Sequence, residues 1–262
     1  MRAARRLGVL PAIAVRVSSA HPLPRSFVVL IGLLAAAAKV TAAPPPTEAF
    51  VESVVKVRAV AADGSQSLGS GVVIASNLLV TACHVTRGAK SIEITHRAEH
   101  WNGKIEAGSV AHDLCLISVQ NLGLPAVAIR RSESLRRGER VIAAGFPGGH
   151  DLVVNDGTVE GLYRYDDGNV IRTSATFQAG SSGGGLFDEH GVLVGVLAFK
   201  ARAGTHLHFA LPADWALPGT IVASQFGAIG ETRESIAFWE GSRASQPAFL
   251  GHAILEAASQ RP

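Results

Sequence analysis

Three short segments of the chain carry side chain types that together can attack a carbonyl group. In chain order they supply a histidine, an aspartate and a serine, which are His84, Asp113 and Ser182. A serine hydroxyl is a poor nucleophile near neutral pH and needs a hydrogen-bonded base, and a histidine base needs a carboxylate that fixes its tautomer and stabilises its protonated form. We therefore interpret Ser182 as the candidate nucleophile, His84 as the candidate base and Asp113 as the residue that orients the base.

Glycines surround the candidate nucleophile in the segment Gly180-Ser-Ser-Gly-Gly-Gly185. A tight loop that points several backbone N–H groups at the oxygen of a tetrahedral intermediate has no room for side chains, so it favours glycine. The sequence predicts that the N–H groups of Gly180 and Ser182 form an oxyanion hole.

The elements that must position these residues are expected to be strands. The chain contains 28 glycines and 12 prolines between short runs of β-branched residues, a pattern typical of strands joined by turns and of an all-β protein. Turn clusters are expected at Asp63-Gly64-Ser65 and at Asn102-Gly103. Two β-rich halves follow, at about residues 50–125 and 138–215.

The catalytic candidates fall at the ends of these expected strands. His84 follows an apolar run, Asp113 precedes the next one, and Ser182 comes from the second half. We expect all three to face a cleft between the halves.

The N-terminal residues 1–42 are predicted to be a signal peptide. Several arginines precede an apolar stretch at 27–38, and Val40-Thr41-Ala42 follows as a cleavage site. The stretch is shorter than the roughly 20 residues that a membrane-spanning helix needs, so cleavage without stable membrane insertion is expected. The protein is then exported, to the periplasm or outside the cell. Residues 43–47 are a proline-rich linker.

The rest of the chain is divided into one domain and a tail. Residues 48–218 are expected to form a single domain, and residues 219–262 a helix packed on it with a loose end, to which we assign no function.

The net charge of +3 comes without any basic run with interleaved aromatics in the body of the chain, so no nucleic-acid partner is expected. His206 with His208, and His96 with His100, lack a third ligand at suitable spacing, so the sequence predicts no metal and no cofactor. The sequence does not indicate an oligomeric state.

The ordered motifs of the chain resemble those of the trypsin-like serine protease superfamily, and within it the bacterial HtrA-type branch, in a form without a PDZ domain. The resemblance rests on six segments: Gly69-Ser70-Gly71, Thr81-Ala82-Cys83-His84, Asp113-Leu114-Cys115-Leu116, Gly145-Phe146-Pro147-Gly148, Gly180-Ser181-Ser182-Gly183-Gly184 and Phe209-Ala210-Leu211-Pro212. It implies two six-stranded antiparallel β-barrels and endopeptidase activity on polypeptides. Ser181 stands where many trypsin-like enzymes have an acidic residue that pairs with a newly cut N-terminus, so other contacts must hold the nucleophile loop.

The same resemblance indicates a primary specificity pocket. Its base corresponds to Thr176, which offers no carboxylate to a basic substrate residue. Together with Phe177, Ala198 and Phe199, this predicts a pocket for a small or medium apolar side chain.

The two cysteines flank the predicted base and acid. Cys83 precedes His84 and Cys115 follows Asp113 by two residues, so the two thiols are expected to be neighbours. They either form a disulfide, as an oxidising compartment favours, or remain buried free thiols.

Two other functions remain open at this stage. A protein that keeps this fold only to bind unfolded chains would not need the triad. An esterase would use the same acyl chemistry, and only a comparison of peptide substrates separates it from a peptidase.

Overall fold

The computed structural model describes residues 46–202, 206–217, 237–242 and 245–259. The predicted signal peptide and residues 43–45 of the predicted linker lie outside these residues. The described chain begins with helix α1 (Pro46–Val51), close to the predicted start of folded structure. Among the described residues, no helix is long and apolar enough to cross a membrane.

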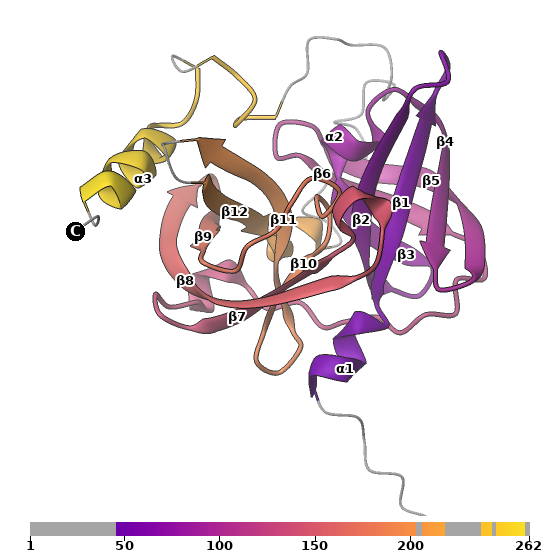
Figure 1. Cartoon of the computed structure of the whole chain (residues 1–262), viewed down its shortest axis with the longest axis horizontal. Helices are drawn as coiled ribbons and strands as arrows, with labels where there is room; N and C mark the ends of the chain where they lie inside the picture. Colours follow the sequence, from indigo (N-terminus) through magenta and orange to yellow (C-terminus); the bar gives the residue numbers. More distant parts are fainter. Residues whose placement is uncertain (1–45, 203–205, 218–236, 243–244, 260–262) are drawn as a thin grey trace, which may run out of the picture. The chain divides into compact units, whose positions relative to one another are not determined.

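The first half of the domain is a closed antiparallel barrel of six strands in the order β1-β2-β3-β6-β5-β4 (Figure 1). The strands are β1 (Val54–Ala61), β2 (Gln66–Ala75), β3 (Leu78–Ala82), β4 (Ala89–His96), β5 (Glu99–Ser109) and β6 (Leu114–Val119), with the short helix α2 (Cys83–Thr86) after β3. Side chains such as those of Val57, Leu79 and Ile117 fill its interior, because alternate residues of each strand point inward.

The second half is a second closed barrel, with the strand order β10-β11-β12-β9-β8-β7. Its strands are β7 (Arg140–Gly145), β8 (Val153–Tyr165), β9 (Gly168–Thr173), β10 (Gly185–Asp188), β11 (Leu193–Arg202) and β12 (His206–Pro212). The 3₁₀ turn η1 (Ser132–Ser134) precedes β7, η2 (Pro147–Gly149) lies between β7 and β8, and η3 (Ala213–Ala216) follows β12. The predicted all-β double barrel is therefore confirmed.

One expected turn is wrong, and its glycine explains why. Asn102 and Gly103 lie inside β5 and pair with Glu93 and Ile92 of β4. A Cβ atom on Gly103 would come within 2.6 Å of the Ile117 side chain, so glycine is there to let β5 pass close to the barrel interior. The expected turn at Asp63-Gly64-Ser65 is present, and Asp63 Oδ1 accepts hydrogen bonds from both the backbone N–H and the hydroxyl of Ser65.

The C-terminal helix α3 (Ala248–Ser259) packs on the second barrel through aromatic and charged contacts. The Phe249 ring stacks on Tyr163 of β8, with ring centroids 5.5 Å apart. Glu256 accepts a hydrogen bond from the Tyr163 hydroxyl (2.9 Å) and pairs with the buried guanidinium of Arg172 (3.3 Å). The predicted C-terminal helix is present, and a buried cation in β9 helps to hold it.

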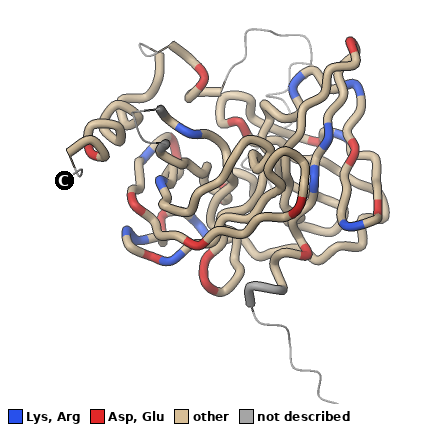
Figure 2. Tube along the Cα trace, viewed as in Figure 1, with Lys and Arg blue, Asp and Glu red and all other residues tan. Residues whose placement is uncertain are grey.

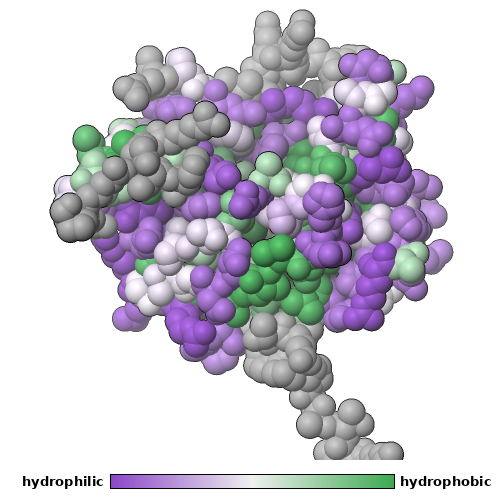
Figure 3. Space-filling view, viewed as in Figure 1, coloured by the Kyte–Doolittle hydropathy of each residue, from purple (hydrophilic) through white to green (hydrophobic). Residues whose placement is uncertain are grey.

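Charged and apolar residues are mixed over the surface. Figure 2 shows Lys and Arg interspersed with Asp and Glu over both barrels. The face in Figure 3 is mostly hydrophilic, with an apolar area near its centre. The exposed large hydrophobic side chains of the described residues are Leu68, Val153, Val154 and Leu255.

Candidate active site

His84 and Asp113 are brought together by the pairing of β3 with β6. Ala82 at the end of β3 lies opposite Leu114 at the start of β6, so the residues that follow and precede these strands meet at one rim of the first barrel. His84 Nδ1 is 2.7 Å from Asp113 Oδ2, and the His84 backbone N–H donates to Asp113 Oδ1 at 2.8 Å. Both carboxylate oxygens of the fully buried Asp113 are thus bound to one histidine, which fixes the ring with Nε2 free to act on another group.

The charge on His84 is set by opposing effects. Burial lowers the pKa of the imidazole, while the hydrogen bond and the negative charge of Asp113 raise it. The carboxylate of Glu240 raises the pKa further and the guanidinium of Arg87 lowers it, and the result is a pKa above the ordinary value of 6.5. His84 is therefore a stronger base than a free histidine.

The Ser182 loop is held by backbone hydrogen bonds on both sides. Gly183 N–H donates to Leu197 O at 2.7 Å, and Gly184 N–H donates to Ser181 O at 2.9 Å. Gly180 and Gly183 have positive φ angles of 94° and 86°. A Cβ on Gly183 would lie 2.2 Å from the Ser70 carbonyl oxygen, so no larger residue fits at that position.

The peptide orientations of the loop suit the predicted oxyanion hole. Ala179 O accepts from Gly148 N–H at 2.8 Å, and Ser181 O accepts from Gly184 N–H. Because the C=O and N–H of a trans peptide point in opposite directions, the N–H groups of Gly180 and Ser182 point away from these partners. Neither N–H has an acceptor within the described parts of the chain.

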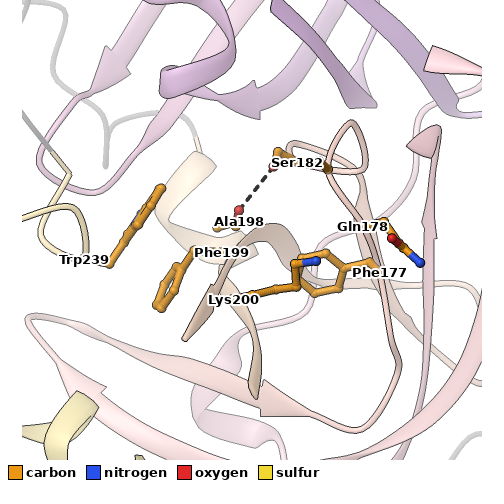
Figure 4. Close-up of a pocket in the computed structure, with 8 residues that line it drawn as sticks. Phe177, Gln178, Ser182, Ala198, Phe199, Lys200 and Trp239 are labelled. Atoms are coloured by element: carbon orange, nitrogen blue, oxygen red, sulfur yellow. Dashed lines mark hydrogen bonds between the residues drawn. The ribbon is translucent and has the colours of Figure 1, made fainter. Parts of the chain in front are cut away.

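Ser182 lies at the same rim as His84, but its hydroxyl has another partner in this structure. Its Oγ donates to Ala198 O at 3.2 Å, as Figure 4 shows, and makes no hydrogen bond to His84. The two chain segments approach each other at Gly69, where a Cβ would lie 2.5 Å from the side chain of Val85 and 3.1 Å from Ser182 O. The structure thus joins His84 directly to Asp113, while the Ser182 hydroxyl is hydrogen-bonded to Ala198 O.

Ser70 of β2 ties the nucleophile loop to the first barrel. Its hydroxyl donates to Gly180 O at 2.8 Å and accepts from Phe146 N–H at 2.9 Å, and its own N–H donates to Ser182 O at 2.8 Å. Ser70 is fully buried. These contacts hold the nucleophile loop, which has no acidic side chain at Ser181 to hold it by an ion pair. The sequence reasoning missed this role of Ser70, although Ser70 lies in one of the motifs it used.

A cavity of about 280 Å³ opens beside Ser182. It is lined by Phe177, Gln178, Ala179, Ser182, Ala198, Phe199, Lys200 and Trp239, several of which are labelled in Figure 4. Three of these residues, Phe177, Ala198 and Phe199, were predicted for the specificity pocket. Lys200 and Trp239 were not anticipated.

Thr176 does not line this cavity. It lies in the wall of a smaller neighbouring cavity of about 20 Å³, where its carbonyl oxygen accepts from Asn155 Nδ2 at 2.8 Å. Phe177 borders both cavities, and its N–H donates to His208 Nδ1 at 3.2 Å. The assignment of Thr176 to the base of the pocket stays a prediction, while Phe177, also predicted for the pocket, lines the cavity beside Ser182.

A model of the family described as the trypsin-like peptidase domain matches residues 69–196. Together with the relatives and solved structures that follow, this match supports a trypsin-like peptidase domain of the HtrA type. The chain is 36% identical over 163 residues to a probable periplasmic serine endoprotease DegP-like of Ectopseudomonas mendocina, a match covering 58% of this chain and 34% of the relative. It is 30% identical over 192 residues to the periplasmic pH-dependent serine endoprotease DegQ of Escherichia coli, covering 69% and 42%. The chain thus spans well under half the length of these curated relatives.

Solved structures agree with this assignment of the peptidase domain. The HtrA-type protease AlgW with a tripeptide has 27% sequence identity and a TM-score of 0.60, and the match covers 66% of this chain and 60% of AlgW. The active form of the Rv3671c protease from M. tuberculosis has 25% identity and a TM-score of 0.61, covering 74% and 88%.

The peptidase domain contains a disulfide between Cys83 and Cys115, with Cα atoms 4.9 Å apart. The bond joins the residue before His84 to a residue of β6 that pairs with Thr81 of β3. It therefore braces the same strand pair that brings His84 to Asp113. Free thiols, the other reading of these cysteines, are not present among the described residues.

Three other histidines of the described residues, His96, His100 and His112, have structural partners. His112 Nε2 is 2.6 Å from Asp166 Oδ2, and its ring lies against Trp215, away from the acid that follows it. His96 contacts Val54 O and Glu52, and His100 contacts Glu93. In the described ranges, no group of three or more histidine, cysteine or carboxylate side chains is arranged to hold a metal ion.

Proposed function

We propose that this protein is a serine endopeptidase that cleaves polypeptides through Ser182, His84 and Asp113 and an acyl-enzyme intermediate. The observation that carries the proposal is the buried carboxylate of Asp113 holding His84 through two hydrogen bonds at the rim that also bears Ser182. A histidine with only a structural role does not require a fully buried carboxylate whose two oxygens both accept hydrogen bonds from it. The similarity to named serine endoproteases supports the same reaction.

The reaction begins when the Ser182 hydroxyl leaves Ala198 O and donates its hydrogen bond to His84 Nε2. Oγ attacks the peptide carbonyl carbon while Nε2 takes the proton, and the negative charge that forms on the carbonyl oxygen is bound by the N–H groups of Gly180 and Ser182. Protonated His84 gives this proton to the nitrogen of the leaving amine, and the C–N bond breaks. Asp113 stabilises the imidazolium between these two transfers.

Water completes the cycle. A water molecule takes the place of the leaving amine and gives a proton to His84 Nε2 as its oxygen attacks the acyl carbon. The second tetrahedral intermediate collapses, the Ser182 Oγ–acyl bond breaks, and His84 returns the proton to Ser182.

The substrates we propose are unfolded or exported polypeptides. The cavity beside Ser182 is walled by Phe177, Ala198 and Phe199, which suits a small or medium apolar side chain in the residue whose carbonyl is attacked. Lys200 at the same cavity disfavours a basic residue there by like-charge repulsion. Export is proposed from the predicted signal peptide and is supported by relatives whose names call them periplasmic.

The experiment treats the purified protein and its Ser182→Ala variant with a fluorophosphonate probe and then with unfolded casein. Labelling and casein cleavage in the wild type, both absent in the variant, are expected. A folded protein that binds casein without cleaving it or reacting with the probe would support a binding protein instead. Labelling with hydrolysis of activated esters but no peptide cleavage would support an esterase.

A further inference from the structure

Residues 237–242, which follow both barrels and lie outside the matched family region, reach the candidate active site. Phe238 N–H donates to Ala111 O at 3.1 Å, two residues before Asp113. Glu240 pairs with Arg87, which follows the His84 helix, with Nη2 and Oε2 2.5 Å apart. Residues 237–242, which we call the active-site segment, are thus bound to the first barrel both near Asp113 and near His84.

The segment places the ring of Trp239 against the catalytic histidine. Its ring stacks on Phe199 at 4.9 Å with an interplanar angle of 12°, and meets His84 edge-on at 5.4 Å and 87°. Phe199 in turn stacks on Phe209 at 4.9 Å. Gln246 Nε2 donates to Trp239 O at 2.8 Å, so both the ring and the backbone of this residue are held. Figure 4 shows Trp239 and Phe199 side by side on the part of the cavity away from Phe177.

The strand next to this ring has a free edge. β10 pairs with β11 only as far as Gly185 opposite Val196, and the hydrogen bonds of Leu197 on that side go to Gly183 and Gly184. From Ala198 to Lys200, no described strand covers this edge of β11. An extended polypeptide can pair with such an edge, and its side chains then point alternately to opposite sides.

This alternation separates two substrate side chains. With the attacked carbonyl at Ser182, the side chain of that residue enters the cavity beside Phe177 and Ala198. The side chain of the preceding residue points the other way, toward the surface formed by His84, Phe199 and Trp239. The Trp239 indole packs against His84 and Phe199 and leaves little space there for a substrate side chain.

We propose that Trp239 is a specificity-determining residue that selects a small side chain, such as glycine, alanine or serine, in the substrate residue immediately before the one whose carbonyl is attacked. The inference rests on the proposed endopeptidase function. Arg87 and Glu240 act with it by fixing the segment that carries the ring.

The test uses two quenched-fluorescence peptides built on one casein cleavage site that differ only at this preceding residue, alanine in one and leucine in the other. The full-length protein and its Trp239→Ala and Trp239→Phe variants are compared, with Leu255→Ala as a control because that side chain is exposed on α3. We expect the wild type to favour the alanine peptide by about tenfold or more in kcat/KM, as steric exclusion by a packed ring implies. Trp239→Ala should bring the ratio toward one, while Trp239→Phe and Leu255→Ala should keep a clear preference for alanine.

The fluorophosphonate labelling rate separates failure of this inference from failure of the proposed function. A wild type that does not label refutes the endopeptidase itself. A wild type that labels and cleaves but favours leucine, or a labelled Trp239→Ala variant with the wild-type ratio, overturns the role of Trp239. If Trp239→Ala does not fold, Trp239→Leu removes the flat ring with less loss of volume and carries the same comparison.

Discussion

The disulfide between Cys83 and Cys115 should stabilise the fold without taking part in catalysis. It joins the start of the His84 helix to β6, yet β3 and β6 are also held by their own hydrogen bonds, with Ala82 opposite Leu114. Both hydrogen bonds from His84 to Asp113 are made by atoms of those two residues and by no cysteine atom. Replacing both cysteines by alanine should therefore lower stability and leave the histidine geometry in place.

The size of the effect follows from the chain that the bond closes. The two cysteines are 32 residues apart, and cross-linking a loop of that length in the unfolded chain contributes about 3 to 4 kcal/mol to the free energy of unfolding. Both sulfur atoms are buried, with Cys83 3% and Cys115 0% exposed, so the space left by two alanines costs about 1 kcal/mol more. At about 2 to 4 °C per kcal/mol for a domain of this size, Tm should fall by roughly 8 to 20 °C.

The assay is thermal and urea unfolding of the wild type and the double alanine variant, with fluorophosphonate labelling at a temperature where both are folded. The expected result is a clearly lower Tm with a labelling rate close to that of the wild type. A folded double variant that no longer labels would refute the reasoning, because the disulfide would then be needed to position the base. A loss of less than about 1 kcal/mol would refute the estimate from loop closure.

Two further predictions concern the groups around the catalytic candidates. Ser70→Ala removes the buried hydroxyl that holds the nucleophile loop, so kcat should fall by about tenfold or more with little change in KM. Tm should fall by several degrees as well, because Gly180 O and Phe146 N–H each lose a hydrogen bond to this buried hydroxyl. Ser70→Thr, which keeps the hydroxyl, should recover part of kcat, and a change confined to KM would count against a role in positioning. The raised pKa of His84 means that activity, which needs the neutral base, should be lost as pH falls through a value above 6.5. Because the Glu240 carboxylate raises that pKa, Glu240→Gln should move the acid limb of the kcat/KM profile to lower pH, and a shift to higher pH would contradict the assigned charge effect.

The sequence predicted the parts of the molecule that short motifs encode. The order of His84, Asp113 and Ser182 indicated the double barrel, and the glycines around Ser182 indicated a loop whose peptide orientations suit an oxyanion hole. These features depend on residues that are near one another in the chain or belong to paired strands.

The features that sequence reasoning missed depend on contacts between distant segments. Trp239 reaches the cavity because Phe238 binds Ala111 and Glu240 binds Arg87. No local sequence pattern predicts contacts between residues so far apart in the chain. Lys200 also lines the cavity, and only the three-dimensional packing places it there.

The same applies to two other residues. The Asn102-Gly103 pair predicts a turn because Asn-Gly favours turns locally, whereas in the fold Gly103 pairs with Val119 of β6 and leaves space for the neighbouring Ile117 side chain. The function of Ser70 is likewise invisible until the two barrels meet at the nucleophile loop.

The most direct test of the account is the rate and position of fluorophosphonate labelling in the wild type, Ser182→Ala and His84→Ala proteins, with the adduct located by mass spectrometry. We predict a single adduct on Ser182 in the wild type, none in Ser182→Ala, and a rate at least about a thousandfold lower in His84→Ala. An adduct on another residue, or an unchanged rate without His84, would contradict the claim that this histidine activates Ser182.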